Sequence, residues 1–178
     1  MSKRELKKYV AQLTKEQLEE QVMELYEKFS PVKVYYNFVF NPKEDSLLQE
    51  AKLKVTNEYF PVGNPGRKTK PRAKMRRSVA QKFIKHYIVL GVDAYIVADL
   101  MLYAIEIAQT YAAENPIKTE TFYKSMYNSF EQAANYCVTN GIFTDFKERI
   151  TGISAEAKLK KWQNRYDFKT LIDKISIL

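Results

Sequence analysis

The sequence has few of the residues on which many catalytic and secreted proteins depend. Its 178 residues include one cysteine, Cys137, and one histidine, His86. A single cysteine excludes an internal disulfide and suits a reducing compartment, so we expect a cytoplasmic protein. A single histidine excludes, within one chain, the paired-histidine and zincin motifs of metal-dependent hydrolases. Five glycines and six prolines are too few for a loop-rich or disordered chain.

The amino terminus does not look like a signal peptide, and the sequence contains no long uninterrupted apolar run. The amino terminus is rich in lysine and has no apolar segment of the kind that signal peptides carry. The most apolar window, residues 84–107, contains Lys85, Asp93, Asp99 and Glu106, each of them costly in a bilayer. We therefore expect no membrane span. A hydrophobic fraction of 46% supplies a core, and we expect residues 1–178 to form a single helical domain.

Apolar residues recur at spacings of three and four along most of the chain, which predicts an all-α fold. We expect about eight or nine helices in successive antiparallel pairs. Residues 14–17, Thr-Lys-Glu-Gln, have the form of a capping box that opens a helix. Residues 94–113 are apolar nearly all round, which predicts a buried central helix. Near the carboxyl end, Gly152 is expected to separate one helix at 144–150 from another at 154–166.

Residues 32–40 are ambiguous, because strand-prone valines and aromatics alternate there with other residues. A β-strand needs a second strand to satisfy its backbone groups, and no other run of this kind exists in the sequence. We therefore interpret residues 32–40 as a helix.

The charge of the chain is concentrated in one stretch. Residues 59–92 hold nine of the 29 lysines and arginines and no acid, which leaves 20 basic against 21 acidic residues elsewhere. The net charge of +8 therefore arises almost entirely in this stretch. It comprises a basic loop at 61–72, in which residues 62–66 are the clearest loop of the sequence, and a helix that is expected to begin near Arg72.

A basic surface needs a counter-charge, which nucleic acid, an acidic protein, an anionic membrane or acids of the same chain can supply. No zinc finger, RNA-recognition signature or helix-turn-helix accompanies the stretch. A phosphate-binding loop fails as well, since Lys68 and Thr69 stand where that motif requires glycine and lysine. Nucleic acid is the most specific ligand that we predict. The candidate binding residues are Arg67, Lys68, Lys70, Arg72, Lys74, Arg77, Lys82, Lys85 and His86.

A stripe of polar residues interrupts the apolar helix at 94–113. Asp99, Tyr103 and Glu106 lie three or four residues apart and share one face. Two carboxylates on one face can serve acid/base chemistry or bind a metal, but they can also form a buried polar network with cations. The preceding helix is rich in arginine and lysine, so we expect it to supply the partners. In that alternative the protein is a helical scaffold for protein–protein interaction or self-association, and its basic face is internally paired.

No residue pattern identifies a reaction. Cys137 lies on an apolar helix seam, which is typical of a core residue, and His86 lies beside lysines and no nucleophile. We predict no catalytic residue, no metal site and no cofactor, and interpret the protein as a binding protein.

Several segments resemble an uncharacterised bacterial family. These are LKKY at residues 6–9, LTKEQL at 13–18, ELY at 24–26 and VKVYYN at 32–37. The segment that starts with GRK at 66–68 and the apolar helix after it are similar too, so the resemblance spans most of the chain. It implies a small, soluble, all-helical bacterial protein, and it transfers no catalytic residues because none are established for the family.

Overall fold

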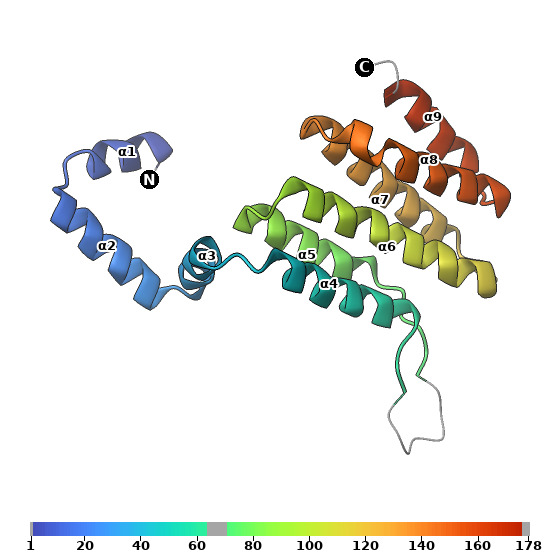
Figure 1. Ribbon diagram of the computed structural model, residues 1–178, viewed down its shortest axis with the longest axis horizontal. Helices are drawn as coiled ribbons and strands as arrows, with labels where there is room; N and C mark the ends of the chain where they lie inside the picture. The colour runs from blue at the N-terminus through green and yellow to red at the C-terminus, as the bar shows by residue number, and fades with distance from the viewer. Residues whose placement is uncertain (1, 64–70, 176–178) are drawn as a thin grey trace. The chain divides into compact units, whose positions relative to one another are not determined.

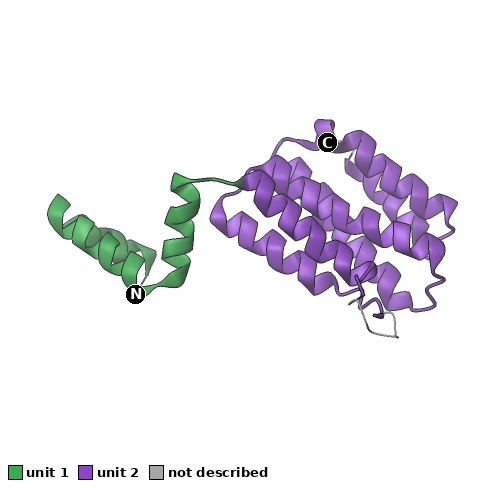
Figure 2. Cartoon of the chain, turned by 60° about the horizontal axis from the view of Figure 1, so that its bottom comes forward, with its two compact units in different colours: residues 1–43 green, residues 44–178 purple. Residues whose placement is uncertain are grey.

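The computed structural model of the protein describes residues 2–63 and 71–175. Within these residues the chain forms nine α-helices and no strand, which confirms the predicted all-α fold (Figure 1). The helices divide into two compact units, residues 1–43 and residues 44–178 (Figure 2). The single domain that the sequence suggests for residues 1–178 stays a prediction.

Unit 1 consists of three short helices, α1 (Lys3–Val10), α2 (Lys15–Lys28) and α3 (Ser30–Phe40). The predicted capping box opens α2, where the Thr14 hydroxyl accepts from the Gln17 amide at 3.3 Å and the Gln17 side chain accepts from the Thr14 amide at 2.9 Å. Helix α2 packs against α3. Residues 32–40 are helical, so the helical interpretation is confirmed and the strand alternative is wrong.

Unit 2 is a bundle organised around one buried helix. Helix α6 packs against α4, α5, α7 and α8, and Figure 1 shows it between them. This arrangement confirms the buried central helix that the sequence predicts at 94–113. The described helices of the unit are α4 (Glu44–Tyr59), α5 (Arg77–Leu90), α6 (Ala94–Glu114), α7 (Glu120–Thr139), α8 (Phe143–Leu159) and α9 (Arg165–Ile175).

The turn between α5 and α6 follows from two residues. Gly91 ends α5 with a φ of 82°, in the left-handed region that glycine occupies without strain. Asp93 then caps α6, because its carboxylate accepts from the Tyr95 amide at 2.7 Å. By length and composition α6 could cross a bilayer, but so could the core helix of many water-soluble bundles. Since α6 is packed on several sides by other helices of unit 2, the described chain has no clear membrane span.

Two predicted helix boundaries are wrong. Helix α8 runs unbroken from Phe143 to Leu159, although Gly152 suggested a stop. Glycine inside a helix costs only about 1 kcal/mol relative to alanine. Burial of Ile150 and Ile153 on either side of the glycine offsets that cost. Helix α5 begins at Arg77 and not near Arg72, because the residues before it bind to the end of α4.

Candidate functional site

The outer side of α5 carries part of the basic stretch. Ser78, Lys82, Lys85, His86 and Val89 recur at helical spacing, and all five side chains are exposed. The inner side of the same helix buries Ala80, Ile84, Tyr87 and Leu90 in the core. This division follows the amphipathic pattern of the sequence. The sequence-predicted residues Lys82, Lys85 and His86 therefore share one accessible face.

A carboxylate at the end of α4 fixes the extended segment that leads into α5. Glu58 is only 8% exposed, and its backbone carbonyl accepts from the amides of Lys74 and Met75 at 2.9 and 3.0 Å. Its carboxylate accepts from Arg76 Nε and Nη2 at 2.9 and 2.8 Å, and from the Arg76 amide at 3.3 Å. Hydrogen bonding by the Arg76 side chain is the main reason that the pKa of Glu58 is lowered. Met75 adopts a φ of 51° beside this contact.

The contact between Glu58 and this segment explains why α5 does not start earlier, and it fixes the segment that carries Arg72 and Lys74. The amides at 74–76 bond to Glu58 and not to a preceding helical turn, so α5 starts only after them. Arg76 forms an ion pair with Glu58, whereas Arg72 and Lys74, in the segment before α5, are exposed to solvent. The predicted residues Arg67, Lys68 and Lys70 lie outside the described residues.

Arg77 differs from the other predicted binding residues. Its Nε donates to Ser129 Oγ at 2.7 Å and its Nη2 donates to Gln132 Oε1 at 3.2 Å, both on α7. Burial against α7 lowers the pKa of Arg77. The arginine therefore joins two helices of the bundle, and its guanidinium is less available to a ligand than the exposed lysines are.

A groove lies between the outer sides of α4 and α5. It has a volume of about 490 Å³ and a mostly apolar lining that also includes cations. Val79 and Phe83, both half-buried, supply apolar side chains. Lys54 comes from α4, outside the basic stretch of the sequence. The residues that line the groove are Lys54, Ser78, Val79, Lys82, Phe83 and His86.

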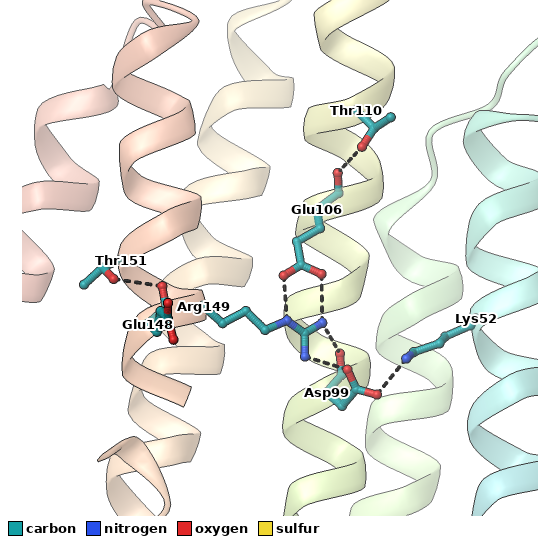
Figure 3. Close-up of polar contacts among 7 residues, drawn as sticks. All are labelled: Lys52, Asp99, Glu106, Thr110, Glu148, Arg149 and Thr151. Carbon is teal, nitrogen blue, oxygen red and sulfur yellow. Dashed lines mark hydrogen bonds and ion pairs between the residues drawn. The ribbon is translucent and has the colours of Figure 1, made fainter. Parts of the chain in front are cut away.

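The predicted polar stripe on α6 lies at the centre of an ion-pair cluster (Figure 3). Arg149 of α8 reaches both carboxylates. It donates to Glu106 at 2.6 and 2.8 Å and to Asp99 Oδ1 at 2.6 Å. Lys52 of α4 donates to the other oxygen of Asp99 at 2.7 Å. The cluster therefore bridges α4, α6 and α8.

This geometry corrects one expectation. We expected the cations of the preceding helix to pair with Asp99 and Glu106, but the described partners come from α4 and α8. The reason is rotational, since the stripe on α6 faces the groove between its neighbours α4 and α8, whereas α5 packs elsewhere on α6. The alternative in which the basic face pairs with Asp99 and Glu106 is therefore wrong on this point, because Lys52 and Arg149 are the partners.

The rest of the stripe extends the network towards α4. The Tyr103 and Thr56 hydroxyls are 2.7 Å apart, and Lys52 Nζ lies 5.0 Å from the centroid of the Tyr103 ring. Burial acts to raise the pKa of Asp99, but hydrogen bonds from Lys52 and Arg149 outweigh it and hold that pKa below its ordinary value. Asp99 therefore stays ionised near neutral pH, which suits a structural ion pair and not a proton donor.

The described residues contain no cluster of three or more histidine, cysteine, aspartate or glutamate side chains that could hold a metal. Cys137 is buried without exposure, and burial raises its pKa to about 11. A thiol of this kind is a core residue and not a nucleophile. His86 is exposed and lies next to the Tyr87 ring, whose centroid is 6.0 Å from its own.

Sequence reasoning missed three cations. Lys52 and Lys54 are two residues apart on α4, and one binds Asp99 while the other lines the groove. Arg149 is 43 residues from Glu106 and follows no motif. The only indication of its role is its position on the helix at 143–159, where it lies at the border between the buried side, which carries Ile150, and the exposed side.

The comparisons with known proteins give a family and no activity. The model of DUF6155, described as a family of unknown function, matches residues 1–176. No curated protein and no solved structure gives a significant match to the chain.

Proposed function

Because the chain belongs to DUF6155, a family of unknown function, no activity carries over from it, and we propose that the protein binds nucleic acid through the basic face of unit 2. The basic face comprises the exposed segment before α5, the outer side of α5 and the groove beside it. Its described cations are Lys54, Arg72, Lys74, Lys82 and Lys85, together with His86.

One observation carries the proposal. Three carboxylates that could have paired with the basic face are already occupied, Glu58 by Arg76 and the pair on α6, Asp99 and Glu106, by Arg149 and Lys52. Among residues 2–63 and 71–175, no lysine or arginine of the basic face forms an ion pair within 4.0 Å. Exposed cations that have no acid of their own provide the non-specific attraction to phosphate on which nucleic-acid binding depends.

The groove adds a feature that a purely electrostatic surface lacks. The partly exposed Phe83 lines the groove together with Lys54 and Lys82, so a base that enters the groove can stack on the ring while its phosphates meet the lysines. This arrangement favours single-stranded nucleic acid, in which bases are free to leave the stack.

The test is a salt titration of binding to random single-stranded and duplex oligonucleotides. The double variant Lys82→Gln/Lys85→Gln is expected to lower the slope of log affinity against log salt by about 1.8 on duplex and about 1.4 on single strands, since each phosphate contact contributes about 0.9 or 0.7. The matched control is Lys158→Gln/Lys169→Gln. It removes the same charge from exposed positions on α8 and α9 and should leave the slope unchanged.

Three results would contradict the proposal. The first is no measurable affinity at about 50 mM salt, where such contacts are strong. The second is an equal loss in the test and control variants, which would indicate attraction to net charge alone. The third is that polyglutamate binds as tightly as the oligonucleotides do and that Phe83→Ala does not change this binding. That result would identify an acidic protein as the partner.

A further inference from the structure

Unit 1 has almost no core of its own. None of its described residues, 2–43, is buried, and its three helices leave large apolar side chains exposed. Of the 18 exposed large hydrophobic residues described in the chain, 11 lie in this unit. They are Leu6, Tyr9, Val10, Val22, Met23, Leu25, Phe29, Val34, Tyr35, Val39 and Phe40.

The apolar surface that unit 1 leaves exposed is extensive. The 11 side chains are 37–82% exposed, which in total amounts to on the order of 1,000 Å² if a large side chain offers about 150–250 Å². A standard interface buries about 800 Å² per partner, so covering this surface requires an interface of ordinary size.

A groove between α2 and α3 gives the surface a shape. It has a volume of about 390 Å³ and is almost entirely apolar. Tyr36 and Phe40 stack at its edge with ring centroids 6.2 Å apart, and Phe40 is 82% exposed. The Tyr26 hydroxyl bonds to Asn37 Oδ1 at 3.2 Å across the groove, so its two walls are held together. The lining residues are Val22, Met23, Tyr26, Tyr36, Asn37 and Phe40.

The charges that flank this surface are opposite on two helices. Helix α1 carries four cations against one acid, a net charge of +3. Helix α2 carries five glutamates against two lysines, a net charge of −3. A two-fold interface places the same surface of both copies face to face, and it is favourable when that surface is self-complementary. Unit 1 meets this condition. In a two-fold dimer the positive α1 of each copy can face the negative α2 of the other copy, so the favourable contact occurs twice.

From these observations we infer that unit 1 is a dimerisation element whose occupant is a second copy of this chain. The two copies pair with α1 against the α2 of the other, and each places Phe40 in the α2–α3 groove of its counterpart. The exposed apolar side chains thereby become the core of a helical assembly, which supplies the burial that 43 residues lack. The proposed interface is built from residues of unit 1 alone, so the inference does not depend on nucleic-acid binding by unit 2.

The first experiment measures the mass of the full chain by sedimentation across a concentration series. The wild type is expected to be a dimer above about 10 µM, since interfaces of this area bind with micromolar affinity or better. Phe40→Lys should weaken the dimer by about 30-fold or more, because a central interface aromatic contributes at that level. Val89→Lys is the matched control. It changes an equally exposed residue, 81% against 82%, on α5 of unit 2 and should leave the mass unchanged.

The second experiment tests the pairing of α1 with α2 and uses only exposed positions, so both variants should keep their helix content. Lys3→Glu/Lys7→Glu changes α1 from +3 to −1, and Glu19→Lys/Glu27→Lys changes α2 from −3 to +1. Each double variant alone places like charges opposite each other and should be monomeric at concentrations where the wild type is a dimer. Their mixture restores opposite charges at both contacts, so we expect a 1:1 heterodimer.

The outcomes separate a second copy from other occupants of the surface. A wild-type monomer at about 100 µM overturns the inference. So does a mixture of the two double variants that stays monomeric, because the charges of α1 and α2 would then act within one chain. An equal effect of Phe40→Lys and Val89→Lys would remove Phe40 from the interface and refute the proposed groove contact.

Discussion

Replacement of Arg149 by methionine is the most direct test of the ion-pair cluster. The change keeps most of the side-chain volume and removes the only described partner of Glu106 as well as one of the two partners of Asp99. The side chains of Arg149, Asp99 and Glu106 are 30%, 23% and 33% exposed. They therefore lie between a buried pair, whose disruption costs about 3–5 kcal/mol, and a surface pair worth about 0–1 kcal/mol.

We expect Arg149→Met to lower the free energy of unfolding by about 2–3 kcal/mol, measured by urea denaturation. For a unit of this size the melting temperature should fall by about 8–12 °C. Lys147→Met is the control, because it removes a cation from an exposed position two residues earlier on α8 and should change the free energy by less than about 0.5 kcal/mol.

The cause of the loss can be separated from its size. Most of the cost should come from leaving Glu106 ionised without its partner, so adding Glu106→Gln to Arg149→Met should recover part of the lost stability. The reasoning is refuted if Arg149→Met costs no more than Lys147→Met. It is equally refuted if Glu106→Gln adds a further loss in the methionine background, since the carboxylate would then have other support.

The remaining predictions concern pH, the end of α4 and the cysteine. The pKa values of Asp99 and Glu58 are lowered in the folded protein. The stability that these carboxylates contribute is therefore present above their unfolded pKa values and is lost as the pH falls through their lower, folded pKa values. The urea concentration at the unfolding midpoint should decrease below about pH 4, and it should decrease less steeply in Asp99→Asn. Glu58→Gln should cost about 1–2 kcal/mol and speed hydrogen exchange at the amide of Arg76, whereas the exposed Glu50→Gln on the same helix should do neither. Cys137 should react with a maleimide only at the rate of unfolding, and rapid labelling of the native protein would contradict its burial.

The fold follows from the sequence wherever one strong signal acts alone. Residues 94–113 are apolar nearly all round, and the structure buries that helix at the centre of unit 2. Gly91 and Asp93 end one helix and begin the next, as their chemistry predicts. Where two signals compete, the weaker local preference gives way. Gly152 does not stop α8, because buried residues on both sides of it continue the core face.

The ion pairs of unit 2 could not be predicted in this way, because long-range partners leave no mark on local periodicity. The stripe of Asp99 and Glu106 predicts that cations must face it, and several helices carry cations. The cation that binds both carboxylates, Arg149, is 50 and 43 residues away from them. Only the packing of α8 beside α6 selects it over the nearer arginines.

Whether a lysine of α4 belongs to the basic face or to the ion-pair cluster depends on the direction in which it points from the helix axis. Lys52 and Lys54 are separated by one residue on α4, a rotation of about 200°, so they point to opposite sides. Lys52 meets Asp99 in the bundle, and Lys54 meets the groove beside Lys82. The acids of α6 are thus neutralised from α4 and α8, and the cations of α5 remain without carboxylates among the described residues. Because α4 and α8 supply the counter-ions of Asp99 and Glu106, Lys82 and Lys85 of α5 are left exposed and form no ion pair among the described residues.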